Sequence, residues 1–88
     1  MTLQQAFFAE TISLPLGESV GRISHGVLCP YPPGIPLIYP GERLTAESVH
    51  YLMRVWHAGI PVLGLHEYDG EPRVPVVRLE EDAWKEMI

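Results

Sequence analysis

One segment of this chain has an unusually restricted backbone. Cys29–Pro36 carries four prolines in eight positions. Each proline fixes φ at about −65°, removes a backbone donor and disfavours the α region for the residue before it. Pro33 and Gly34 suit the central pair of a type II turn, because glycine supplies the positive φ. We therefore expect a stiff loop here, with little conformational entropy left to lose on contact.

A second turn follows at Tyr39-Pro40-Gly41-Glu42, where glycine again comes after proline. Two interpretations of the whole segment remain open. In the first it is a rigid connector, and its apolar neighbours fill the core: Val27, Leu28, Ile35, Leu37 and Ile38.

In the second interpretation, the loop holds side chains ready for a ligand or a protein surface. Rigid aromatic anchors bind at a low cost in conformational entropy, which favours such a role. The candidate interface and loop-presenting residues are Arg22, Tyr31, Pro32, Pro33, Gly34, Tyr39 and Glu42.

Composition limits the remaining choices. A chain of 88 residues with 47% hydrophobic and 19% charged residues fits one folded domain over 1–88. Its net charge of −5 repels phosphate backbones, so we expect no nucleic-acid partner. The longest uncharged stretch, 23–41, holds too many prolines and glycines to span a membrane. The amino end lacks the pattern of a secretory leader, and the single cysteine, Cys29, indicates a reducing cytoplasm.

One helix is clearly indicated near 46–58. Thr45 is a good N-cap, and Gly59 can take the left-handed conformation after the last turn. Between them, apolar residues recur at helical spacing on one face: Val49, Leu52, Met53 and Trp56.

The other elements are short, so the fold class is α+β with short mixed or antiparallel strands. We expect extended segments over 6–16, 23–29, 36–39 and 60–65, and a turn or short helix over 16–20. Asp69-Gly70 predicts a hairpin turn into a strand over 73–79. Pro72 and Pro75 predict that this strand lies at an edge, where self-association would cover it. The tail over 80–88 is predicted to be a short helix.

No residues stand out as catalytic, metal-binding or cofactor-binding. His50 and His57 lie two helical turns apart, a rise of about 10.5 Å, too far to share one ion unaided. Cys29 lies between apolar neighbours and is interpreted as a small core residue, and the acidic run 80–82 as a solvated helix start.

Arg22 needs a partner, because it lies between a glycine and an apolar strand. We expect its guanidinium to pair with a carboxylate such as Glu18 or Glu42, or to bond loop carbonyls that the prolines leave free. In each case the planar guanidinium group is required, and the single ammonium group of lysine cannot replace it.

Three motifs carry a family resemblance. Gly21-Arg22-Ile23-Ser24, the run Cys29–Pro36 and Pro40-Gly41-Glu42 closely resemble the carboxy-terminal domain of bacterial ornithine/lysine/arginine decarboxylases. The resemblance covers roughly residues 6–65. Members of that family are pyridoxal-phosphate-dependent lyases whose catalysis lies in a large upstream body, on which the terminal domain packs.

The resemblance implies a non-catalytic module that presents the Pro-Gly loop to the enzyme body or to another copy of itself. No cofactor is expected on this chain alone, since its single lysine, Lys85, lies in an acidic tail. The alternative is a free-standing regulatory or scaffold binding protein that kept this fold and changed partner.

Overall fold

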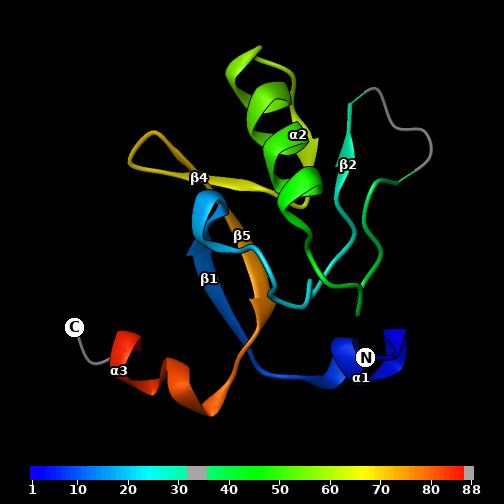
Figure 1. The fold of residues 1–88 in the computed structure, drawn as a ribbon, viewed down its shortest axis with the longest axis vertical. Helices are drawn as coiled ribbons and strands as arrows, with labels where there is room; N and C mark the ends of the chain where they lie inside the picture. The colour runs from blue at the N-terminus through cyan, green and yellow to red at the C-terminus, as the bar shows by residue number, and fades with distance from the viewer. Residues whose placement is uncertain (32–35, 87–88) are drawn as a thin grey trace.

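A three-stranded antiparallel sheet organises the fold, which is α+β as expected. The computed structural model describes residues 1–31 and 36–86, with side chains to Trp84. The central strand β5 (Glu71–Val77) pairs with β1 (Thr11–Pro15) on one side and β4 (His66–Tyr68) on the other. A second, two-stranded sheet joins β2 (Cys29–Pro30) to β3 (Val62–Leu63) (Figure 1).

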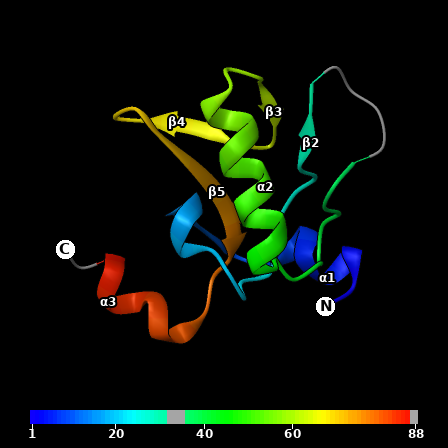
Figure 2. The ribbon, with the colours of Figure 1, turned by 45° about the horizontal axis from the view of Figure 1, so that its top comes forward.

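The predicted main helix is confirmed as α2 (Ala46–His57). Thr45 caps it through a reciprocal pair of hydrogen bonds with Ser48, each 3.0 Å long. Gly59 has φ +81°, the left-handed conformation expected after the helix. The helix lies between the β4–β5 hairpin and β2 (Figure 2), and its buried residues are Val49, Leu52 and Val55.

The core lies between α2 and the inner face of the sheet. Its fully buried large side chains come from every part of the chain: Leu16, Leu28, Leu44, Leu52, Val74 and Val76. Burial of one such side chain contributes about 1.5–3 kcal/mol. Cys29 is buried among them, as the sequence predicted.

Two segments, 21–31 and 36–44, run antiparallel and are joined by backbone hydrogen bonds; we call this pair the loop arm. The bonds run along its whole length: Gly21 N–H to the Leu44 carbonyl at 2.7 Å, Ser24 N–H to Glu42 at 2.8 Å, and Leu28 N–H to Ile38 at 2.9 Å. The proline-rich segment is therefore the connection at the far end of an irregular ladder.

The loop arm is fastened to its neighbours on both sides. Val77 N–H bonds the Ile23 carbonyl at 2.8 Å, which joins the arm to the end of β5. Tyr31 N–H bonds the Pro61 carbonyl at 2.8 Å, next to β3. The turn at 39–42 is confirmed, since Gly41 has φ +90° and the Glu42 N–H bonds the Tyr39 carbonyl at 3.1 Å.

The prediction that Pro72 and Pro75 hold their strand at an edge is wrong, because β5 is central. In an antiparallel strand, the nitrogen and carbonyl of a residue point to the same side. The Pro75 carbonyl accepts from His25 N–H at 3.1 Å, so its nitrogen also faces away from β1, and pairing with β1 loses no bond. Pro72 comes one residue before Arg73, which is the first residue of β5 that pairs with β1, so Pro72 lies just outside that pairing.

The extended segment predicted over 6–16 is wrong in its first part. Leu3–Phe8 form a short helix, α1, and only β1 is extended. Thr2 and Gln5 form a capping box, with bonds of 2.9 and 3.1 Å. This helix packs under the loop arm, because Ala6 is fully buried and its carbonyl lies 3.0 Å from His25 Nδ1.

Other boundaries also differ from expectation. The segment 23–29 forms isolated bridges before β2, and 60–65 contributes only β3, because the chain turns at Gly64 with φ +98°. The hairpin turn is confirmed, with Asp69 at φ 54° and Gly70 at φ 81°. The tail is a 3₁₀ turn, Glu80–Asp82, followed by α3 (Ala83–Glu86). Within the described ranges, no helix is both long and apolar enough to cross a membrane.

Gly64→Ala should destabilise the fold strongly. A Cβ at this position would overlap the Val27 carbonyl oxygen and approach Leu28, and φ +98° is unfavourable for alanine. We expect a loss of about 2–4 kcal/mol in the free energy of unfolding, measured by urea denaturation. Gly17→Ala is the matched control, since no atom lies within 4 Å of its Cβ position. Equal stability of the two variants would contradict the packing described.

Candidate functional site

Arg22 forms a bidentate contact with the buried carboxylate of Asp82. Its Nη2 lies 2.5 Å from Asp82 Oδ2 and 3.1 Å from the Val77 carbonyl, and its Nη1 lies 3.2 Å from Asp82 Oδ1. The side chains are 13% and 2% exposed, so water screens the pair weakly. This bidentate contact ties the loop arm to the end of β5 and to the C-terminal turn.

The expected pairing of Arg22 with a carboxylate is confirmed, but the two carboxylates named as examples are not its partner. Neither Glu18 nor Glu42 pairs with it; Asp82 does, together with a carbonyl at the end of a strand. The interpretation of the acidic run 80–82 as fully solvated fails for Asp82, which is 1% exposed. Within the 3₁₀ turn, Asp82 Oδ2 accepts a hydrogen bond from Leu79 N–H at 2.8 Å. This bond directs the carboxylate toward the interior.

The other predicted interface residues lie apart from Arg22. Tyr31 is 61% exposed and Tyr39 48%, on the two segments of the loop arm. Glu42 is exposed, and its Oε1 accepts from Tyr39 N–H at 2.6 Å, which braces the turn. Pro32, Pro33 and Gly34 lie outside the described residues, so the predicted turn at 33–34 is not part of the structure described.

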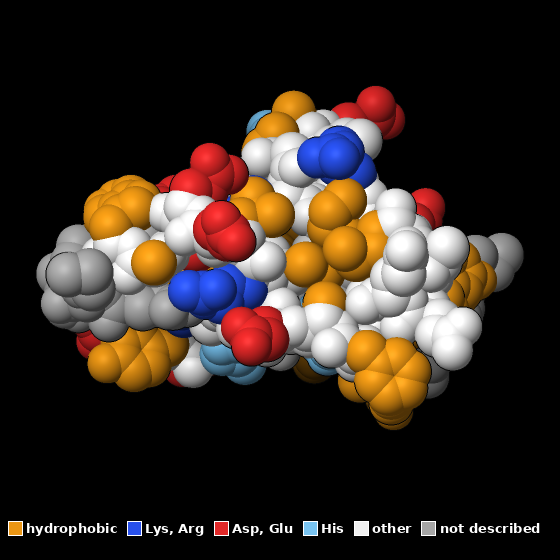
Figure 3. Space-filling model, turned by 90° about the horizontal axis from the view of Figure 1, so that it is seen from below, with side chains coloured by type: hydrophobic (Ala, Val, Ile, Leu, Met, Phe, Trp, Pro, Cys, Tyr) orange, Lys and Arg blue, Asp and Glu red, His pale blue; other side chains and the backbone are white. Residues whose placement is uncertain are grey.

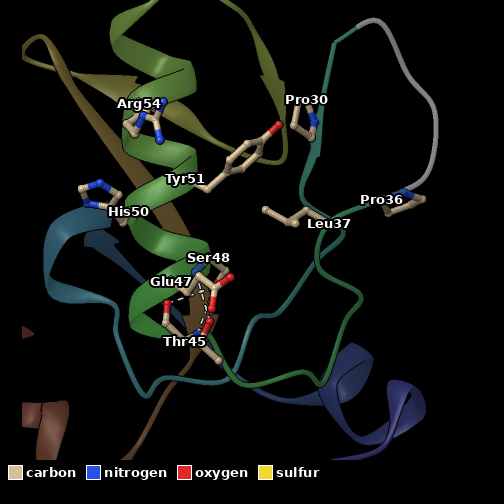
Figure 4. A pocket seen from close by; sticks show the side chains of 9 residues that line it. All are labelled: Pro30, Pro36, Leu37, Thr45, Glu47, Ser48, His50, Tyr51 and Arg54. Carbon is tan, nitrogen blue, oxygen red and sulfur yellow. Dashed lines mark hydrogen bonds between the residues drawn. The ribbon is translucent and has the colours of Figure 1, made fainter.

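Sequence reasoning missed a groove of about 750 Å³ between α2 and the loop arm. Figure 4 shows Tyr51 pointing from the helix across to Pro30 on the opposite wall. The lining residues are Pro30, Pro36 and Leu37 from the arm, and Thr45, Glu47, Ser48, His50, Tyr51 and Arg54 from the start and outer face of the helix. The sequence feature that could have indicated this groove is Tyr51, an aromatic residue on the polar face of the predicted amphipathic helix.

The groove has mixed charge and no metal-binding arrangement. Glu47 and Arg54 contribute opposite charges, two helical turns apart. His50 lines the groove, but the described part of the chain has no group of three or more histidine, cysteine, aspartate or glutamate side chains that could hold a metal.

Comparison with known proteins identifies the family. A family model described as "Orn/Lys/Arg decarboxylase, C-terminal domain" matches residues 2–64. The chain belongs to this family. It is 45% identical over 64 residues to an arginine decarboxylase of Bacillus subtilis, an alignment that covers 73% of this chain and 13% of that protein. It is 47% identical over 45 residues to the constitutive lysine decarboxylase of Escherichia coli, covering 51% and 6% of the two chains.

Solved structures give the same result over a longer region. The constitutive lysine decarboxylase of E. coli matches with a TM-score of 0.78 and 34% identity over 89% of this chain and 13% of that chain. Lysine decarboxylase A of Pseudomonas aeruginosa matches with a TM-score of 0.72 and 33% identity, at the same coverage. A match of 89% extends past residue 64, so it includes part of the β4–β5 hairpin. The aligned part of the chain covers only 13%, about an eighth, of the length of the B. subtilis arginine decarboxylase and of the E. coli constitutive lysine decarboxylase.

The residues present do not fit pyridoxal phosphate, the cofactor of this family. Covalent binding of that cofactor requires a lysine, and the only lysine of the chain, Lys85, lies in the short helix α3. Among the side chains that the structure describes, which end at Trp84, no lysine lines the groove beside α2 or the hollow on the outer face of the sheet.

Arg22→Lys should lower the free energy of unfolding by about 1–2 kcal/mol, because a single ammonium group cannot replace a fork that bonds Asp82 twice and Val77 once. Arg78→Lys is the matched control. Arg78 lies 3.8 Å from Glu10, whose side chain is 83% exposed, and such surface pairs contribute less than about 1 kcal/mol. Thermal and urea denaturation of both variants measure the difference, and an Arg22→Lys curve that coincides with the parent would refute the role assigned to the fork.

Proposed function

We propose that this chain is a non-catalytic module of an ornithine/lysine/arginine decarboxylase, and that it presents the tip of the loop arm to the enzyme body. The observation that carries the proposal is family membership, with an aligned region that covers only 13% of the relative from B. subtilis. The catalytic lysine and cofactor would then lie on the body.

The anchoring of the loop arm supports a presenting role. Hydrogen bonds hold both of its segments right up to the tip: Leu28 N–H to Ile38, Leu37 N–H to Leu28, and Tyr31 N–H to Pro61, each 2.8–2.9 Å. Flanking residues that are already ordered lose little entropy on binding, so more of the contact energy is available for affinity.

Exposed apolar side chains supply contact area. Tyr31 and Tyr39 both present aromatic rings to solvent, and aromatic anchors dominate many interfaces. Phe7 and Phe8 of α1 are also exposed, with ring centroids 5.2 Å apart. On the face that carries α1 and α3, hydrophobic side chains form several separate patches with charged side chains between them (Figure 3). These patches would be covered if the body packs there.

The enzyme body is a better candidate partner than a second copy of this chain. The expectation of self-association depends on an exposed edge at the strand over 73–79. In the structure both edges of β5 are paired, one with β1 and the other with β4. The flanking strands are short, and β1 ends in Pro15, which blunts its outer edge.

Binding in trans tests the proposal. The arginine decarboxylase of B. subtilis, with its own terminal domain removed, is mixed with this chain and analysed by size-exclusion chromatography with light scattering. We expect co-elution, and at least about tenfold weaker binding for Tyr31→Ser/Tyr39→Ser, because two aromatic anchors are lost.

Two controls accompany the experiment. The removed domain, added back in trans, shows that the truncated body is competent to bind. Tyr68→Ser removes an equally exposed tyrosine from β4, away from the loop arm, and should leave binding within about twofold. If the body binds its own domain but not this chain, the alternative of a free-standing regulatory or scaffold protein replaces the proposal.

A further inference from the structure

The outer face of the sheet carries a small hollow of about 390 Å³, away from the loop arm tip and the groove beside α2. Four residues line it: Ser13, His66, Tyr68 and Arg73. They come from all three strands, β1, β4 and β5. Arg73 is the Cα partner of His66, so these two side chains leave the sheet on the same side.

Arg73 is held in one orientation by Ser13. Its Nε donates to Ser13 Oγ at 3.1 Å, and its Nη2 donates to the Ser13 carbonyl at 2.9 Å. These bonds use the edge of the guanidinium that Nε and Nη2 form. The Tyr68 ring lies beside the group, with its centroid 5.9 Å from the guanidinium carbon.

The opposite edge of the guanidinium, formed by Nη1 and Nη2, keeps unused donors. No hydrogen bond or ion pair occupies Nη1 among the described residues, where the ion pairs are Arg22 with Asp82 and Arg78 with Glu10. Glu71 is nearest in sequence on the same face but forms no ion pair with Arg73.

His66 adds a second basic group beside Ser13. Its Nε2 lies 2.9 Å from Ser13 Oγ. That oxygen already accepts from Arg73 Nε, so its own proton is available to bond the histidine nitrogen. The other ring nitrogen and the Tyr68 hydroxyl are further polar groups in the lining, and no lining residue carries a negative charge.

We propose that this hollow binds a small oxyanion, either a carboxylate or a tetrahedral phosphate or sulfate group. The free edge of Arg73 contacts two oxygens of the anion at once, the arrangement in which a guanidinium binds oxyanions best. Ser13 fixes the guanidinium in advance, which reduces the entropy lost on binding. His66 and Tyr68 complete the lining from β4.

Solution NMR tests the site with sulfate and, separately, acetate as probes, at constant ionic strength. We expect saturable shifts at the Arg73 Nε–H and the His66 ring, with half-saturation at roughly 1–10 mM, as for a weak exposed site. Saturation by either anion supports the proposal and identifies the preferred oxyanion geometry. Shifts that rise linearly with both anions would overturn it.

Matched variants separate the site from general charge. Arg73→Gln should weaken binding at least about tenfold, whereas Arg78→Gln, which removes the same charge just after β5, should change it less than about twofold. Glu71→Gln should strengthen binding roughly twofold by removing a nearby negative charge. Ser13→Ala keeps the charge of Arg73 and its bond to the backbone carbonyl of residue 13, but removes the Oγ acceptor of Arg73 Nε. The guanidinium is then held less firmly, so a loss of a few fold is expected even if Arg73→Gln perturbs the sheet. Equal affinity in Arg73→Gln and Arg78→Gln contradicts the assignment.

Discussion

The backbone ladder of the loop arm is the constraint on which the rest of the structure depends. It starts where Gly21 meets Leu44 and ends where Leu28 meets Ile38. Because the ladder is paired along its length, the two ends of the proline-rich segment are brought together by the fold itself. This is why a chain with so many irregular residues can still build a buried core.

The position of the arm is set by contacts that reach it from both ends of the chain. Below it, the residues that lead into α1 pack against Gly41, where a Cβ would come within 2.6 Å of the Met1 carbonyl oxygen. Beside it, Arg22 bonds Val77 and Asp82. A buried ion pair of this kind is costly to break, because a lone charge would then remain in a weakly hydrated site. The terminal segments thus hold the arm in its position against the sheet.

Local rules predicted local structure well. The capping residue Thr45, the glycine at 59 and the Asp69-Gly70 turn each act through their own backbone neighbours, so the sequence alone was sufficient for α2 and the hairpin. The same rule applied to Thr2 and Gln5 would have found α1. The position of Pro75 in a central strand and the inward turn of Asp82 depend on which distant segment comes alongside, which local propensity does not contain. The groove beside α2 and the Ser13–Arg73 contact are missed for the same reason, since each joins segments far apart in the sequence.

Hydrogen exchange tests the central claim most directly, namely that the arm is ordered up to its tip before any partner binds. The amides to follow are those of Leu28, Tyr31 and Ile38, which bond carbonyls of other segments. The account predicts that, in the isolated chain, they exchange within about tenfold of the buried α2 amides such as that of Leu52. Exchange of these three amides near the unprotected rate, while α2 stays protected, would show an arm that is not held by the fold and would contradict the account.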